Sequence, residues 1–285
     1  MIPNIIHFVF GMAEDFGGKP FSLSHYLAVK SAAVVNRPQQ IYFHYQFEPS
    51  GKWWEKAKPL LTLNKVIAPD IFMGCRLYHT AHKADVVRLQ MLQQFGGVYL
   101  DMDTICVQSF QPFYNNDCVI GQEENPEKSA KNIIKKITYT IKSFFTRSKK
   151  PTIIGLCNAV ILAEKNSVFI SRWLNSYHSF RSKGRDKYWN EHSVIVPEKL
   201  ALKNPGSITI LGPHAFHYPL YNKQGLQEMH RQVKCFPEAY VHHLWESFSW
   251  NDYLSKLTPE NIFEQETTYS LLARKYLSTE QLINN

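Results

Sequence analysis

The sequence predicts an α/β protein in which a Rossmann-like open sheet carries helices on its faces. Short apolar runs alternate with segments of helical periodicity over the first hundred residues, which is typical of such sheets. A length of 285 residues suits one domain with insertions. With 44% hydrophobic and 20% charged residues, the composition excludes disordered, collagen-like and coiled-coil chains. We expect one domain over residues 1–250 and a helical extension over 251–285 packed on it.

The first elements follow from apolar runs and their stop signals. Gly11 ends the first run, and Asn36-Arg37-Pro38 stops the first helical segment. In chain order we expect strands and helices at 5–10 (strand), 22–35 (helix), 41–45 (strand), 52–61 (helix) and 66–68 (strand). Sheets of this βαβ order bind ligands at the carboxyl ends of their strands.

The segment 78–103 contains the strongest functional signal. Thr80 is a candidate N-cap for a helix that ends at Gly96, a residue that tolerates positive φ. Gly96-Gly97 then leads into a predicted strand over 98–103, where alternation places Asp101 and Asp103 on the same face. Two adjacent carboxylates repel unless a cation joins them, and hard oxygen ligands favour Mg²⁺ or Mn²⁺.

A D-x-D sequence alone is weak, because it occurs by chance in many surface turns. Here it ends an apolar strand behind a Gly-Gly helix stop, where no solvated turn is expected. A divalent ion held there neutralises a departing diphosphate. Asp85 and Arg88 lie on the same face of the preceding helix. They are either an exposed ion pair or, with the D-x-D pair downstream, ligands for sugar hydroxyls and diphosphate.

Two strings carry a family resemblance, residues 82–92 (HKADVVRLQML) and 96–103 (GGVYLDMD). They resemble the sugar-binding region containing the DXD motif in glycosyltransferase family 32 and its relatives, which include α1,4-galactosyltransferases, initiating mannosyltransferases and the glucosyltransferase domains of clostridial toxins. Residues 2–11 look like the family's first strand, beside the nucleotide base. Residues 240–250, with Tyr240 to Trp245 first, are similar to its C-terminal histidine segment.

The resemblance implies a GT-A fold, a nucleotide-activated sugar, Mn²⁺ and transfer with retention of anomeric configuration. It implies that Asp85 and Arg88 hold the donor sugar, and that Asp101 and Asp103 serve the metal. His243 matches the third metal ligand, with a shift to His242 left open. Other positions matched to the donor site are Phe8, Val9 and Phe10 beside the base, Asn158 in the cleft, and Ser247 and Trp250 in a closing segment.

For several of these residues a purely structural reading stays open. His242 and His243 can each be a buried histidine outside any metal site. Asn158 can be an amide that caps a loop. The implied reaction is a retaining hexosyl transfer from a sugar nucleotide, with a UDP-hexose as donor, to a glycan or glycolipid hydroxyl in polysaccharide or glycoconjugate biosynthesis.

Other function classes remain as alternatives. The acceptor can instead be a protein side chain, or the enzyme can be a metal-dependent hydrolase of a sugar nucleotide. Glycosidases separate their carboxylates across a cleft by about 5 to 9.5 Å, usually on different elements, which argues against glycan hydrolysis. A lectin-like or membrane-scaffold protein has no need for a metal that neutralises diphosphate.

The net charge of +8 is concentrated between residues 128 and 150, which carry eight cations and no acidic residue. Apolar residues there recur every three or four positions, so the spacing predicts a basic amphipathic helix over 131–150. Such a helix attaches to an anionic membrane surface, at about 1 kcal/mol per cation, or packs on the core with a solvated lysine face. Nucleic-acid binding ranks last, because the aromatics lie on the apolar side.

Location follows from what the sequence lacks. No run approaches the ~18 apolar residues of a membrane span, and the first residues lack the order of a secretory signal. We therefore expect a cytoplasmic protein, peripheral at the inner face of the membrane. The five cysteines contain no C-x-x-C pair, so we interpret all of them as reduced core thiols.

Overall fold

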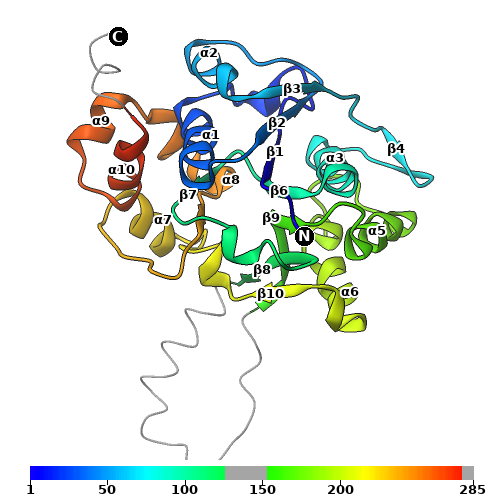
Figure 1. Cartoon of the computed structure of the whole chain (residues 1–285). Coiled ribbons are helices and arrows are strands. Elements are labelled where there is room, and N and C mark those ends of the chain that lie inside the picture. The colour runs from blue at the N-terminus through cyan, green and yellow to red at the C-terminus, as the bar shows by residue number, and fades with distance from the viewer. Residues whose placement is uncertain (126–152, 278–285) are drawn as a thin grey trace, which may run out of the picture.

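A seven-stranded sheet, in the order β10-β8-β9-β6-β1-β2-β3, forms the centre of the molecule (Figure 1). The computed structural model describes residues 1–125 and 153–277. Six of these strands run parallel, and β9 runs antiparallel between β6 and β8. The seven strands are β1 (Ile5–Val9), β2 (Gln40–Tyr45), β3 (Thr62–Lys65), β6 (Gly97–Leu100), β8 (Cys118–Glu124), β9 (Ile153–Ala163) and β10 (Thr209–Leu211).

Two short antiparallel pairs lie outside this sheet. They are β4 (Ile71–Phe72) with β5 (Cys75–Arg76), and β7 (Thr104–Cys106) with β11 (Val241–His243). In the second pair His243 stands opposite Thr104, the residue after the D-x-D motif. This register brings the C-terminal histidines to the motif.

Helices cover both faces of the sheet, with α3 and α5 on one side and α1 on the other (Figure 1). The helices are α1 (Leu23–Asn36), α2 (Lys52–Ala57), α3 (Thr80–Phe95), α5 (Val168–Asn175), α6 (Val196–Lys203), α7 (Lys223–His230), α8 (Glu246–Ser249), α9 (Pro259–Glu264) and α10 (Thr268–Ala273). The α/β architecture expected from the sequence is confirmed.

Strand β6 shows how the chain fills two apolar layers. Val98 and Leu100 are fully buried in the cluster that contains Leu27 of α1. Tyr99, between them, is buried in the opposite cluster with Leu89 of α3. Because successive side chains of a strand point to opposite faces, one short apolar strand packs against both layers.

Several expected boundaries need correction. The helix expected from Thr80 is capped by His79, whose ring accepts a hydrogen bond from the Ala81 backbone N–H. The third strand lies at Thr62–Lys65 rather than 66–68, because its register pairs Tyr45 with Lys65. The helix expected over 52–61 ends at Ala57 and continues as a 3-10 turn.

The strand expected over 98–103 also ends early, at Leu100. Asp101 to Asp103 form a turn before β7, so strand alternation does not place the two carboxylates. The Asp101 backbone N–H still donates to the Ala159 carbonyl of β9, in the register of β6, and the chain turns after it. Aspartates favour such turns because their side chains bond nearby backbone groups.

The C-terminal segment contains two helices rather than one continuous periodicity. Thr258 caps α9 through a capping box with Asn261. The helix ends at Glu264, and α10 begins as a separate helix at Thr268. Ile262 and Tyr269 are fully buried in the same cluster as Leu27 of α1, and the Tyr276 hydroxyl donates to the Cys106 carbonyl at 2.8 Å. The extension therefore shares the core of the sheet.

Two further expectations concern the surface. The basic helix expected over 131–150 lies outside the described residues. Within the described ranges, no helix is both long and apolar enough to cross a membrane. All five cysteines are free thiols, but Cys235 is exposed, so it is not the core thiol that we expected.

Candidate active site

A pocket of about 320 Å³ opens where β1 ends beside the turn that follows β6. Val9 and Phe10 form its wall on the β1 side, and Asp101, Met102 and Asp103 form the wall on the turn side. The third wall comes from the end of β11 and the start of α8, with these lining residues: His243, Trp245, Glu246, Ser247 and Phe248. The carboxyl ends of parallel strands meet at this edge, the usual ligand position in an open α/β sheet.

Arg88 joins the helix α3 to the D-x-D turn. Its guanidinium lies 3.1 Å from the Asp85 carboxylate and 3.0 Å from Oδ1 of Asp101, and it donates to the Asn158 carbonyl at 2.9 Å. Arg88 and Asp85 are buried, with 7% of each side chain exposed, and the guanidinium stands 4.4 Å from the centre of the Tyr99 ring. This is a desolvated, multiply bonded pair rather than the exposed ion pair that was the alternative.

Asn158 joins Arg88, Asp85 and Asp101 because β9 is irregular at this residue. The β8–β9 register jumps between Ile120 and Gly121, which releases three residues of β9 from β8. Asn158 lies in this bulge, and its amide donates to the Asp85 carboxylate at 2.7 Å. Bulges of this kind redirect a side chain toward a functional site. Asn158 is therefore a buried partner of Asp85, not the cap of a loop.

Asp103 faces the other side of the turn. Its Oδ2 accepts a hydrogen bond from the Glu246 backbone N–H at 2.6 Å and lies 3.3 Å from Nε2 of His243. The Asp103 carbonyl accepts from the Leu244 N–H. Trp245, which lies between Leu244 and Glu246, has a positive φ of 54°. This left-handed conformation directs the Glu246 N–H at the Asp103 carboxylate.

The electrostatics differ for the two aspartates. Burial raises the pKa of Asp101, although Arg88 opposes that change. Burial also acts to raise the pKa of Asp103, but the His243 imidazole and the Glu246 N–H hold it well below its ordinary value. Burial alone would lower the pKa of His243, and the Asp103 carboxylate raises it. Each of the two groups thus favours the charged form of the other.

The donor atoms fit a hard divalent cation. Ligand atoms of Asp101, Asp103 and His243 all lie within 4.8 Å of one another. Within the described residues, both hydrogen bonds of the Asp101 side chain end on Oδ1, which leaves Oδ2 for another ligand. Two carboxylates and an imidazole suit Mn²⁺ or Mg²⁺.

The remaining predicted residues divide into two groups. Val9, Phe10 and Ser247 line the pocket. Phe8 is fully buried in the core, and Trp250 stacks on His25 (6.2 Å between ring centres) without lining the pocket. His242 bonds the Tyr218 carbonyl through Nδ1 at 2.7 Å, so of the two histidines the structure places His243 beside the motif.

Comparison with known proteins shows the family of this chain. Residues 28–124 match the family model of the glycosyltransferase sugar-binding region containing the DXD motif. Glucan organizing enzyme 1 of Cryptococcus neoformans var. grubii serotype A is 33% identical over 283 residues, covering 97% of this chain and 71% of that protein. The chain belongs to the DXD glycosyltransferase family. It is therefore an enzyme of the glycosyltransferase class.

Solved structures also resemble this glycosyltransferase at low sequence identity. Mouse xyloside xylosyltransferase 1 in its apo form is 13% identical with a TM-score of 0.49, covering 87% of this chain and 99% of that one. A galactosyltransferase solved with donor and acceptor sugar analogues is also 13% identical, with a TM-score of 0.44 and coverage of 96% and 97%.

Sequence reasoning missed one group in this glycosyltransferase. Glu246 accepts from Lys19 at 3.0 Å and lies 2.8 Å from Nε2 of His25, which also lines the pocket. The group ties the segment before α1 to the start of α8. No motif or spacing links residues more than 220 positions apart, so only the folded structure reveals it.

Proposed function

We propose that this glycosyltransferase binds Mn²⁺ or Mg²⁺ through Asp101, Asp103 and His243 and transfers a hexose from a nucleotide-diphosphate sugar, a UDP-hexose, with retention of configuration. The acceptor is a hydroxyl of a glycan or glycolipid. The observation that carries the proposal is the convergence of two carboxylates and one imidazole within 4.8 Å at the wall of a pocket at the end of β1.

The chain's own groups prepare this site in two ways. Arg88 and Tyr99 both donate to Oδ1 of Asp101, which fixes that carboxylate on the side of α3. On the other side, the Glu246 backbone N–H orients Asp103. When bound, the divalent ion supplies positive charge for the departing diphosphate. Arg88 adds a second fixed charge nearby, and preorganised charge of this kind lowers the barrier without reorganisation.

The donor is accommodated along the pocket walls. The Val9 and Phe10 wall is apolar and suits the nucleobase, while Ser247 at the start of α8 suits a phosphate oxygen. Asp85 does not line this pocket itself but is held by Arg88 and Asn158 beside Asp101, and we propose it as the acceptor for hydroxyls of the donor sugar. With no carboxylate identified as a nucleophile, we propose that the acceptor hydroxyl attacks on the same face through an oxocarbenium-like state.

Donor binding tests the proposal directly. UDP, GDP, CMP and TDP sugars are screened by thermal shift with and without Mn²⁺, using wild type, Asp103→Asn and the exposed carboxylate control Asp252→Asn. We expect stabilisation by UDP-hexoses only with the metal, lost in Asp103→Asn and retained in Asp252→Asn. Equal stabilisation with and without Mn²⁺ would contradict the metal role, and stabilisation by another nucleotide would change the donor. The anomeric configuration of the product, read by NMR, tests retention.

The cation-rich segment supports a second proposal, that the acceptor lies at a membrane. Eight cations without an acidic residue between positions 128 and 150 favour an anionic lipid surface. We expect a chain lacking residues 131–150 to lose binding to anionic vesicles while keeping metal-dependent donor binding. Unchanged vesicle binding would refute the membrane role.

A further inference from the structure

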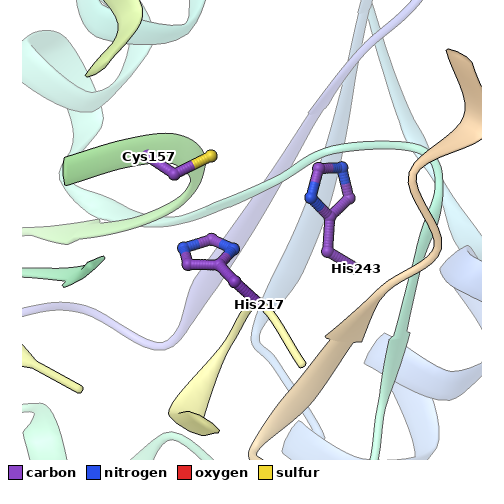
Figure 2. Close-up of side chains that lie close together, drawn as sticks. All are labelled: Cys157, His217 and His243. Atoms are coloured by element: carbon purple, nitrogen blue, oxygen red, sulfur yellow. The ribbon is translucent and has the colours of Figure 1, made fainter. Parts of the chain in front are cut away.

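Three buried side chains meet directly behind the D-x-D pocket. Cys157 of β9, His217 and His243 of β11 have ligand atoms within 4.8 Å of one another, and they point toward a common space (Figure 2). Cys157 is 5% exposed, His217 fully buried and His243 8% exposed. His243 also lines the pocket, so this space borders a route to solvent.

The two imidazoles carry polar atoms that the described residues do not satisfy. Nδ1 of His243 is buried without a hydrogen-bond partner, and the two buried ring nitrogens of His217 have at most one between them, the Gly121 backbone. Figure 2 shows Nδ1 of His243 on the side facing Cys157 and His217. Unsatisfied buried polar groups are unfavourable and rare in native structures, so two or more in one cluster indicate a missing ligand.

We propose that Cys157, His217 and His243 form a binding site for a thiophilic divalent cation, Zn²⁺, distinct from the hard-cation site of the pocket. One thiolate with two imidazoles is a donor set typical of zinc. Zn–S and Zn–N bond lengths imply ligand atoms about 3.3–3.8 Å apart, so the side chains close by at most about 1.5 Å. The buried Glu123 lies beside this cluster, and its carboxyl accepts a hydrogen bond from the Cys157 thiol.

Ion binding at this site requires one proton to leave. Burial raises the pKa of the Cys157 thiol, so the free site holds the protonated sulfur. Zn²⁺ replaces that proton, forms the Zn–S bond and sends H⁺ to the solvent, whereas the imidazoles bind as neutral rings. Affinity for Zn²⁺ therefore rises with pH.

The two sites share one imidazole. Nε2 of His243 is directed at Asp103, and Nδ1 belongs to the cysteine cluster. A neutral imidazole has one free lone pair, so Zn²⁺ at Nδ1 leaves the proton on Nε2, where it donates to Asp103. Zn²⁺ and the pocket cation therefore bind antagonistically. This antagonism rests on the proposed function, whereas Zn²⁺ binding itself does not.

Cobalt absorption tests the site without measuring activity. The full chain with Cys75→Ser and Cys235→Ser, which removes the two thiols that are not buried, is titrated with Co²⁺ and then Zn²⁺. We expect a thiolate-to-cobalt charge-transfer band that saturates at one equivalent of Co²⁺ and disappears when Zn²⁺ is added. Cys157→Ser on this background should lack the band, and Asp103→Asn should keep it. Absence of the band from the starting protein, or its persistence in Cys157→Ser, would overturn the proposal.

Competition separates this inference from the proposed function. His217→Gln is a second variant, and its far-UV circular dichroism and melting temperature confirm folding. Cys157→Ser and His217→Gln should each lower the Zn²⁺ affinity by more than the about 10–100-fold typical of losing an outer-sphere partner. In wild type Zn²⁺ should reverse the Mn²⁺-dependent nucleotide shift, and in Cys157→Ser it should not. A cobalt band without any nucleotide shift would contradict the proposed function alone, and unaltered Zn²⁺ affinity in both variants would contradict this site.

Discussion

His44 and His7 form a directed hydrogen-bonded pair across β1 and β2, with Nε2 of His44 3.0 Å from Nδ1 of His7. The chain continues on both sides, from the Asn64 amide to Nδ1 of His44 at 2.8 Å and from Nε2 of His7 to the Gly96 carbonyl at 2.8 Å. Because the Asn64 amide donates and the Gly96 carbonyl accepts, each ring carries one proton and stays neutral. The pair anchors the turn that precedes the D-x-D strand.

Acid should weaken the fold through this pair. Burial lowers the pKa of His7 to about 4 and that of His44 to about 3 from 6.5. The unfolded chain binds more protons than the folded one below pH 6.5, so the free energy of unfolding falls as pH drops from 6.5 toward 4. The loss for His7 is on the order of 3 kcal/mol. Denaturant unfolding at several pH values measures it.

The matched variant for this experiment is His44→Gln, whose amide still donates to His7 but does not titrate. Its stability should decline less steeply between pH 6.5 and 4 than that of wild type. Parallel pH profiles for the two proteins would show that the pair does not titrate as described.

Two glycines with positive φ should respond differently to alanine. A Cβ at Gly97 (φ +112°) would lie 2.5 Å from the Ile5 carbonyl oxygen, whereas one at Gly51 (φ +100°) meets nothing within 4 Å. Both variants carry backbone strain, but only Gly97→Ala pushes β6 away from β1. We expect it to cost about 1–3 kcal/mol more than Gly51→Ala in chemical denaturation. Equal costs would mean that backbone strain alone decides the effect.

Removing the guanidinium of Arg88 should be severe. Arg88→Gln leaves the buried Asp85 and the partly buried Asp101 without their cation, which costs about 3–5 kcal/mol and removes donor binding. The control is Arg181→Gln, which breaks an ion pair whose arginine is 54% exposed and should cost at most about 1 kcal/mol. Similar melting temperatures for both variants would contradict the difference in burial.

Substitutions of the two adjacent histidines, His242 and His243, should differ in their effect on metal-dependent nucleotide binding. His243→Ala removes the imidazole beside Asp103, so we expect the Mn²⁺-dependent nucleotide shift to disappear. His242→Asn removes a ring bonded to the Tyr218 carbonyl on the other side of β11, and the shift should persist. Loss of the shift in both variants, with folding intact, would place the metal between the two rings.

The sequence predicts the first half of the sheet well, because its strands are local apolar runs bounded by glycine and proline. It does not predict that β9 enters antiparallel between β6 and β8, since this pairing depends on contacts about 30 to 66 residues apart. The third strand begins four residues earlier than expected from the sequence, for a related reason. Its register is set by β2, not by its own apolar residues.

The candidate site was predictable where its residues fall in one motif. Asp85, Arg88, Asp101 and Asp103 lie within 19 consecutive positions of the chain. Their roles as metal and donor ligands stay predictions, although the structure brings them together. The strand alternation used to align the two carboxylates was wrong, because the turn begins at Asp101.

The bond from the Glu246 N–H to Asp103 spans 143 residues of chain. During synthesis, the motif therefore leaves the ribosome long before β11 and α8 exist to complete the pocket. Contacts of such large sequence separation form late, because the chain between them must be ordered first. The nascent protein thus has its first strands before its proposed cation site, and the pocket is complete only after β11 and α8 have been synthesised.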